Sequence, residues 1–255
     1  MERKREMQLP FVSDLNKQLP EMDKVFKATI EPWWEETYPY YQQMQEETIW
    51  KALPPVTTAA FEYLGCGHQS VTFANIFRIA YFANFIHATV KDEEEGQQHN
   101  RELQFSILIG DFLFGRLLKL LVEADHKRIM LPFAVMICTI NEGRVMKHKM
   151  NAVTEQAVEK IYAPFYEIIF LSAGFLANKN REFRDLYRQL GFNLGMAIEL
   201  CNYPALAEQA YKYIAAALGQ FKQINQRYHL SNSRLENMIS EISHFLPETG
   251  AAAVI

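Results

Sequence analysis

The side chains that could do chemistry in this 255-residue chain are few, and the densest group is the acidic run from Asp92 to Glu95. Carboxylate oxygens are the ligands that hard divalent cations prefer, so Asp92 and Glu93 are weak candidate ligands for magnesium. The same run also fits a solvated loop that ends a helix and turns at Gly96. The sequence contains no His-x-x-x-His pair, glycine-rich phosphate loop or evident Ser-His-Asp set, so we assign no catalytic residue.

A second group of chemically capable side chains is basic. It consists of Arg144, Lys147, His148 and Lys149. These residues could bind a phosphate, but the same pattern is typical of an exposed helix end, where cations favour the helix dipole. His87 lies in an apolar segment and is expected to be a core histidine with a hydrogen-bond partner.

Composition limits the class of protein. The net charge of -4 and the pI of about 6.0 argue against a nucleic-acid-binding protein. We expect Cys66, Cys138 and Cys201 to be core residues in a reducing compartment, because their surroundings are apolar. The basic N-terminus is not followed by an apolar stretch, and no uninterrupted apolar run reaches about 18 residues. We therefore expect a cytoplasmic protein without a secretory signal or a membrane span.

The elements that must position these residues are helices. Glycine and proline are sparse, strand-like alternation is nearly absent, and the segment 70–90 is apolar almost all round, which predicts a buried helix. Further helices are expected at 101–123, 128–148, 152–178, 181–201, 205–226 and 232–246. The sequence predicts a single all-α domain of about eight to ten helices. Within it, an aromatic N-terminal segment, 1–48, should pack on a body formed by 49–255.

Several short segments of this body resemble one enzyme family. The segment Gly110 to Arg116 and the segment Gly191 to Ala197 resemble helical motifs of the trans-polyprenyl diphosphate synthases. Shorter matches in the same order are Phe61 to Gly65, Phe85 to His87, and Glu142-Gly143. The resemblance covers roughly residues 49 to 218 and implies an isoprenoid-synthase-like fold. Members of this family condense isopentenyl diphosphate onto an allylic diphosphate, with magnesium held by two Asp-Asp-x-x-Asp motifs on facing helices.

This chain departs from both metal-binding motifs. The first motif corresponds to residues 88–92, in which Ala88 and Thr89 replace acidic residues and Asp92 is the acidic residue that remains. The second corresponds to residues 202–206, which contain no acidic residue. Its positions are held by Asn202, Tyr203, Pro204, Ala205 and Leu206. The glutamine that usually precedes this motif corresponds to Glu199. The resemblance therefore implies that the magnesium ligands are lost.

The basic residues that the family uses to bind diphosphates are also depleted. Lys51 is the one remnant of the acceptor site, and Gln97 and Gln98 lie where the family has an arginine pair. The catalytic Lys-Thr pair should fall near Tyr162-Ala163, with Lys160 two positions away. The resemblance also implies that a segment between the second motif and the last helices is deleted in this chain.

Three functions stay open. The chain resembles the small, non-catalytic component of heteromeric hexaprenyl or heptaprenyl diphosphate synthases, which make the menaquinone side chain. In that case it would pair with a catalytic large subunit, with the interface or product tunnel formed by Phe105, Ile109, Asp111, Phe112, Phe114 and Leu117. The alternatives are a divergent active prenyltransferase and a stand-alone homodimer that binds an isoprenoid chain or a protein. We expect no cofactor, except magnesium if the divergent enzyme is correct.

Overall fold

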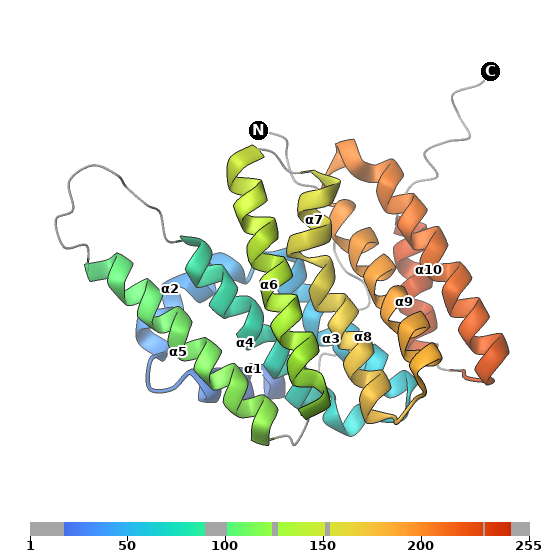
Figure 1. Ribbon diagram of the computed structural model, residues 1–255, viewed down its shortest axis with the longest axis horizontal. Coiled ribbons are helices and arrows are strands. Elements are labelled where there is room, and N and C mark those ends of the chain that lie inside the picture. The colour runs from blue at the N-terminus through green and yellow to red at the C-terminus, as the bar shows by residue number, and fades with distance from the viewer. Residues whose placement is uncertain (1–17, 90–100, 124–126, 151–153, 232, 246–255) are drawn as a thin grey trace.

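The computed structural model describes residues 18–89, 101–123, 127–150, 154–231 and 233–245 (Figure 1). These residues form eleven α-helices, which confirms the predicted all-α class and slightly exceeds the expected number of helices. The helices are α1 Leu19–Ile30, α2 Trp34–Met44, α3 Thr48–Tyr63, α4 Ser70–Thr89, α5 Arg101–Glu123, α6 Lys127–Met150, α7 Glu155–Ile161, α8 Ala163–Leu176, α9 Arg181–Leu200, α10 Ala207–Tyr228 and α11 Ser233–Phe245.

The prediction of one continuous helix over 152–178 is wrong. The chain breaks at Tyr162 and forms two helices, α7 and α8. Pro164 explains the break, because its ring would clash with the carbonyl of Lys160 in a continuous helix and it has no N–H to donate. Proline is tolerated in the first turn of a helix, which is where Pro164 lies in α8.

Capping side chains fix other helix ends. Thr154 Oγ1 accepts a hydrogen bond from the backbone N–H of Ala157 at the start of α7, and Asn180 Oδ1 accepts one from Phe183 at the start of α9. Asn178, between α8 and α9, has a φ of 50°, a left-handed conformation that asparagine adopts more readily than most residues. The predicted helix boundary between 178 and 181 is therefore confirmed.

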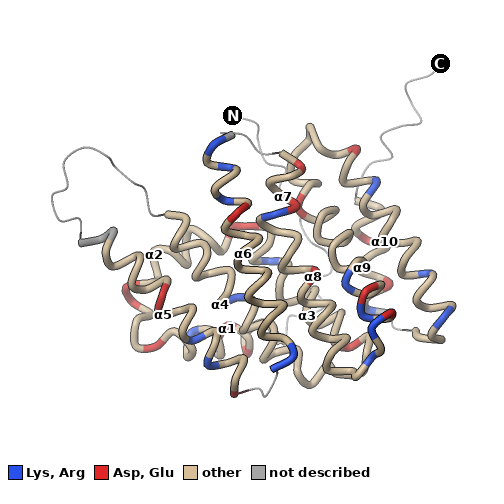
Figure 2. The backbone as a smooth tube through the Cα atoms, viewed as in Figure 1, with Lys and Arg blue, Asp and Glu red and all other residues tan. Residues whose placement is uncertain are grey.

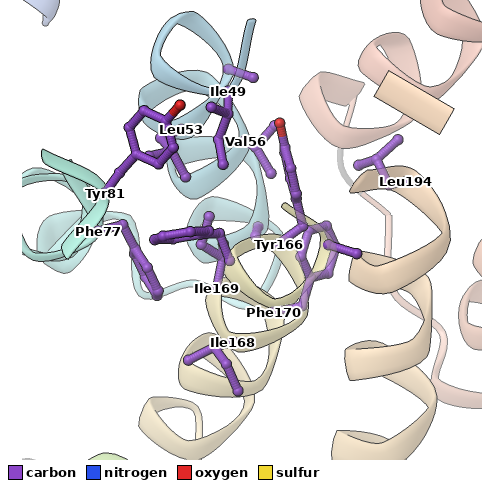
Figure 3. Close-up of a cluster of buried hydrophobic side chains, with 14 of the residues drawn as sticks. Ile49, Leu53, Val56, Phe77, Tyr81, Tyr166, Ile168, Ile169, Phe170 and Leu194 are labelled. Atoms are coloured by element: carbon purple, nitrogen blue, oxygen red, sulfur yellow. The ribbon is translucent and has the colours of Figure 1, made fainter. Parts of the chain in front are cut away.

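Helix α4 lies in the middle of the bundle and is buried along most of its length, as its uniform apolarity predicts. Its neighbours are α1, α2, α3, α5 and α8. Figure 3 shows Leu53 and Val56 of α3, Phe77 of α4, and Ile169 and Phe170 of α8 within one buried cluster. This cluster connects α3, α4 and α8.

The helices α1 and α2 pack against α4, where the guanidinium of Arg78 is buried. Arg78 of α4 is 3% exposed, and its Nη2 lies 2.7 Å from Oδ1 of Asp23 in α1. The guanidinium carbon lies 4.0 Å from the centroid of the Trp50 ring and 4.9 Å from that of Phe26. The counterion and the two aromatic faces compensate for removing the charge from water.

Helix α6 carries one expectation that needs correction and one property that its sequence did not reveal. Cys66 and Cys201 are buried as expected, but Cys138 is exposed, because it lies on the outer side of α6. The segment Lys127–Lys149 of α6 is also long and apolar enough to cross a membrane by length and composition alone. The search for an uninterrupted apolar run missed this helix. Only 28% of its most apolar window is buried inside the protein, so α6 presents an unusually apolar outer side.

Candidate functional site

Helices α8 and α9 approach each other so closely that α9 needs glycine at two positions. A Cβ atom at Gly191 would lie 2.6 Å from the backbone oxygen of Tyr166, and one at Gly195 would lie 2.4 Å from the Tyr166 ring. Both distances are shorter than a normal van der Waals contact. The segment Gly191 to Ala197 therefore makes room for the Tyr166 ring between the two helices.

Tyr166 uses this position to reach Glu199, one turn beyond Gly195 on α9. The hydroxyl of Tyr166 donates a hydrogen bond to Glu199 Oε1 at 2.5 Å, and Glu199 is only 4% exposed. A hydroxyl bound to a carboxylate makes a short, strong hydrogen bond. The Glu199 charge also acts on three further tyrosines. We refer to Tyr81, Tyr162, Tyr166, Tyr203 and Glu199 as the tyrosine–glutamate cluster.

All four tyrosines of the cluster have raised pKa values. Burial and then the charge of Glu199 raise the pKa of Tyr166 well above its usual value, and the same two causes raise the pKa of Tyr203 to about 12. Burial is also the largest cause for Tyr81 and Tyr162, although the positive charge of Arg144 opposes both shifts. The four hydroxyls are therefore protonated at neutral pH. They can donate hydrogen bonds, but they are not the anionic ligands that magnesium prefers.

The first motif begins at the end of α4. Ala88 is exposed, and the hydroxyl of Thr89 donates a hydrogen bond to the backbone oxygen of Ile86 at 2.7 Å. The Thr89 hydroxyl is thus used in a hydrogen bond at the end of α4. Asp92 and Glu93, like the rest of the acidic run and the glutamines 97 and 98, lie outside the described residues.

The second motif ends α9 without offering a carboxylate. The side-chain nitrogen of Asn202 lies 3.3 Å from the backbone oxygen of Ile198 and 3.2 Å from that of Glu199, so Asn202 binds carbonyls at the helix end. Leu206 closes the short helical turn that leads into α10. Among the described residues, no three His, Cys, Asp or Glu side chains are grouped so that they could hold a metal ion. The described residues therefore do not fit the magnesium sites that the family resemblance implies.

Lys51, the predicted remnant of the acceptor site, and Lys160, two positions from the expected catalytic pair, are each held by a carboxylate. Lys51 Nζ lies 2.7 Å from Oε2 of Glu46. Lys160 Nζ lies 3.1 Å from Oε2 of Glu142, and the Lys160 side chain packs against Gly143, where a Cβ would come within 2.6 Å. The Glu142-Gly143 match therefore has a structural role, because it joins α6 to α7.

The basic group at the end of α6 divides into two parts. Lys147, His148 and Lys149 are exposed, whereas Arg144 is half-buried and its charge acts on Tyr81 and Tyr162. The Nε atom of Arg144 is buried without a hydrogen-bond partner among the described residues. Only Arg144 of this group therefore belongs to the candidate site.

The Gly110 to Arg116 segment joins α5 to its neighbours. A Cβ at Gly110 would overlap the His87 ring at 1.8 Å, and Asp111 Oδ1 lies 3.5 Å from His87 Nε2. Arg116 Nε donates a hydrogen bond to the backbone oxygen of Thr29, at the end of α1. His87 is therefore half-buried at a helix contact rather than enclosed in the core.

The suggested interface residues of α5 lie on different sides of the helix. Ile109 and Leu117 are buried in the protein's own core. Phe105, Phe112 and Phe114 are partly buried against that core, and Asp111 is exposed. The large apolar side chains that α5 does expose are different ones: Ile107, Leu108, Leu118 and Val122. Sequence reasoning missed them because α5 is apolar on both its inner and outer sides.

The tyrosines of α4 and α8 were also missed. Tyr81 and Tyr166 belong to apolar helical stretches and looked like ordinary core residues. The one signal that could have indicated them is the pair of glycines four residues apart on α9, because this spacing places a gap on one helix face that a neighbouring ring can fill.

Comparisons with known proteins agree on one fold. No family model matches the chain. It is 26% identical over 168 residues to an all-trans-nonaprenyl-diphosphate synthase (geranyl-diphosphate specific) of Rhodobacter capsulatus. This match covers 59% of the chain and 51% of that protein, so it spans about half the length of the relative.

Solved structures match over nearly the whole chain. A polyprenyl synthase from Caulobacter crescentus, complexed with calcium and isoprenyl diphosphate, has a TM-score of 0.73 at 14% identity and covers 96% of this chain and 100% of its own. A mint heterotetrameric geranyl pyrophosphate synthase, as a deletion mutant with ligands, has a TM-score of 0.64 at 15% identity. It covers 91% of this chain and 99% of its own. The predicted isoprenoid-synthase-like fold is confirmed.

Proposed function

We propose that this chain is a member of the trans-polyprenyl diphosphate synthase family that does not transfer prenyl groups by itself and serves as a subunit of a long-chain polyprenyl diphosphate synthase. The sequence match to a nonaprenyl diphosphate synthase supports both the family and the long-chain product. The likeness to a heterotetrameric synthase supports the idea that this fold works in mixed assemblies.

The tyrosine–glutamate cluster is the observation that carries the proposal. Ionising an allylic diphosphate builds negative charge on the leaving group, and cations must be in place to receive it. The cluster instead offers protonated hydroxyls and a carboxylate that Tyr166 already binds. Lys51 and Lys160 are each paired with a glutamate. Since one lost preorganised group typically costs about 10²–10³ in rate, loss of the whole set should remove most of the acceleration.

An assay with purified chain tests the proposal. The chain alone is incubated with magnesium, isopentenyl diphosphate and farnesyl diphosphate, and prenyl products are extracted and measured. We expect no product above a protein-free control. Addition of the chain to the synthase of the same organism that has both aspartate motifs should change the rate or the product length. Heat-denatured chain is the control and should change neither.

A divergent active prenyltransferase is the second candidate, and the acidic run from Asp92 to Glu95 favours it. Turnover by the chain alone that is lost in Asp92→Asn would establish this activity and overturn our proposal. Recovery of a bound isoprenoid, together with no effect on the synthase, would instead identify a stand-alone binding protein.

A further inference from the structure

Helices α1 and α5 both pack against α4 and leave a groove between them, which we call the α1–α5 groove. Its volume is about 300 Å³, at the lower end of the range for small-molecule sites. Since a water molecule occupies about 30 Å³ in the liquid, the groove has room for about ten waters or a ligand of similar size. The lining residues are Val25, Ala28 and Thr29 of α1, and Arg116, Lys119, Leu120 and Glu123 of α5.

Hydrogen bonds between three helices fix the walls of the groove. Arg116 Nε donates to the backbone oxygen of Thr29 at 3.0 Å, which ties α5 to α1. Asn75 Nδ2, on α4, donates to the Thr29 hydroxyl at 2.9 Å. That hydroxyl donates its own proton to the backbone oxygen of Val25 at 2.8 Å. Thr29 therefore holds the groove in shape and has no proton left to give to a ligand.

The side-chain groups that remain available to a ligand are mainly cationic. The two terminal nitrogens of Arg116 have no hydrogen-bond partner among the described residues. Lys119 Nζ lies 3.5 Å from Oε1 of Glu123, and both of these side chains are exposed. Two cations and one carboxylate give the lining a net charge of +1. Figure 2 shows basic residues on the carboxyl-terminal half of α5, where this helix passes α1.

The remaining lining side chains are apolar. Val25 and Leu120 are half-buried, and Leu120 packs against the core of the bundle. Ala28 lies beside them on α1 and is exposed. The groove thus joins an apolar wall to a guanidinium with free donors, and a guanidinium fork suits the paired oxygens of a carboxylate or a phosphate.

We propose that the α1–α5 groove binds a small amphiphilic anion, in which a carboxylate or monophosphate group is attached to a short apolar chain. Arg116 binds the anionic group, Lys119 adds electrostatic attraction, and the apolar wall contacts the chain. The volume of the groove limits the ligand to about ten non-hydrogen atoms. None of the lining residues belongs to the tyrosine–glutamate cluster, so this site is independent of the proposed function.

Isothermal titration calorimetry of the purified full chain tests the ligand class. Octanoate and octyl phosphate are the probes, and octanol and inorganic phosphate are the controls that each lack one half of the ligand. We expect both probes to bind one-to-one with a Kd below about 1 mM, which is a modest affinity for a ligand of this size. Added salt should weaken binding, and the tighter probe identifies the preferred anionic group. Octanol binding as tightly as the probes, or no binding of either probe, would overturn the proposal.

Substitutions that fill the groove test its location. Leu120→Trp fills it from α5 and Ala28→Phe fills it from α1, so each should weaken octanoate binding by more than about tenfold. Leu118→Trp is the matched control, because Leu118 is an exposed residue of α5 outside the lining. It should leave the Kd unchanged. Circular dichroism establishes that each variant is folded, and octanoate binding that survives both filling substitutions would show that the ligand binds elsewhere.

Charge substitutions test the sign of the ligand. Arg116→Gln should weaken octanoate binding by more than about tenfold, the scale of a hydrogen bond to a charged group. Lys119→Gln should weaken it by about two- to fivefold, and Glu123→Gln should strengthen it by a similar factor, as exposed charges do. The Lys119 and Glu123 variants leave the hydrogen bond between Arg116 and α1 intact. No change in either of them, or changes of the opposite sign, would refute the electrostatic assignment.

Discussion

Replacement of Tyr166 by phenylalanine tests whether the tyrosine–glutamate cluster holds the site together. The substitution keeps the ring between α8 and α9 but removes the hydroxyl that donates to Glu199 at 2.5 Å. A hydrogen bond to a charged group is worth about 1.5–3 kcal/mol, and both residues are buried, so we expect a loss of about 2 kcal/mol in the free energy of unfolding. For a domain of this size, that corresponds to a fall of about 4–8 °C in Tm.

The chain provides a matched control for this measurement. Tyr213 also donates a hydrogen bond to a glutamate, with its hydroxyl 2.8 Å from Oε1 of Glu155, but this pair is only partly buried. Tyr213→Phe should cost less than about 1 kcal/mol, because water can replace the lost partner.

Urea unfolding of both variants, and of Glu199→Gln alone and with Tyr166→Phe, gives the comparison. The double variant should be less destabilised than the sum of the two single changes, since both remove the same hydrogen bond. The reasoning is refuted if Tyr166→Phe costs no more than Tyr213→Phe, or if the effects of Tyr166→Phe and Glu199→Gln are additive.

Three further outcomes follow from the packing and the pKa shifts. Gly195→Ala should cost about 1–3 kcal/mol in urea unfolding, because the new methyl group would lie 2.4 Å from the Tyr166 ring. Gly219→Ala, with no atom within 4 Å of the new Cβ, should instead stabilise by up to about 1 kcal/mol, and the same sign for both would contradict this. The raised pKa values of Tyr166 and Tyr203 contribute stability below about pH 10 that is lost as the pH rises further, by up to about 1.4 kcal/mol per pH unit for each tyrosine that stays protonated. Unfolding at pH 9 and pH 11 checks this, and Tyr166→Phe should make the decline shallower. Lys51→Ala should change stability by less than about 1 kcal/mol, since its ion pair with a glutamate is exposed, and a larger loss on thermal unfolding would show that Lys51 does more.

The sequence predicted the helices better than it predicted their faces. Helix α5 begins and ends where its apolar spacing indicates, and α4 is buried as its uniform apolarity predicts. On α5, apolar spacing does not predict which side is buried, because the helix is apolar on two opposite sides. Ile109 faces the core and Leu108 faces outward, although the two are adjacent and chemically alike.

The candidate site could be only partly predicted for a related reason. The positions of the lost motifs follow from local patterns, so Asn202 and Lys51 could be identified without coordinates. The contact between Tyr166 and Glu199 joins residues 33 positions apart in the sequence, and such a pair depends on how α8 and α9 cross. Local spacing alone does not determine that crossing.

The burial of Arg78 also gives the first helix a role in the interior of the bundle. Its counterion, Asp23, is supplied by α1, while the aromatic rings that flank it come from α1 and α3. Without α1, the guanidinium would keep its charge but lose its carboxylate and one aromatic face, and would be opened to water beside the central helix. Helix α1 thus covers the buried guanidinium. A shortened protein that lacks α1 should expose the middle of α4 to solvent.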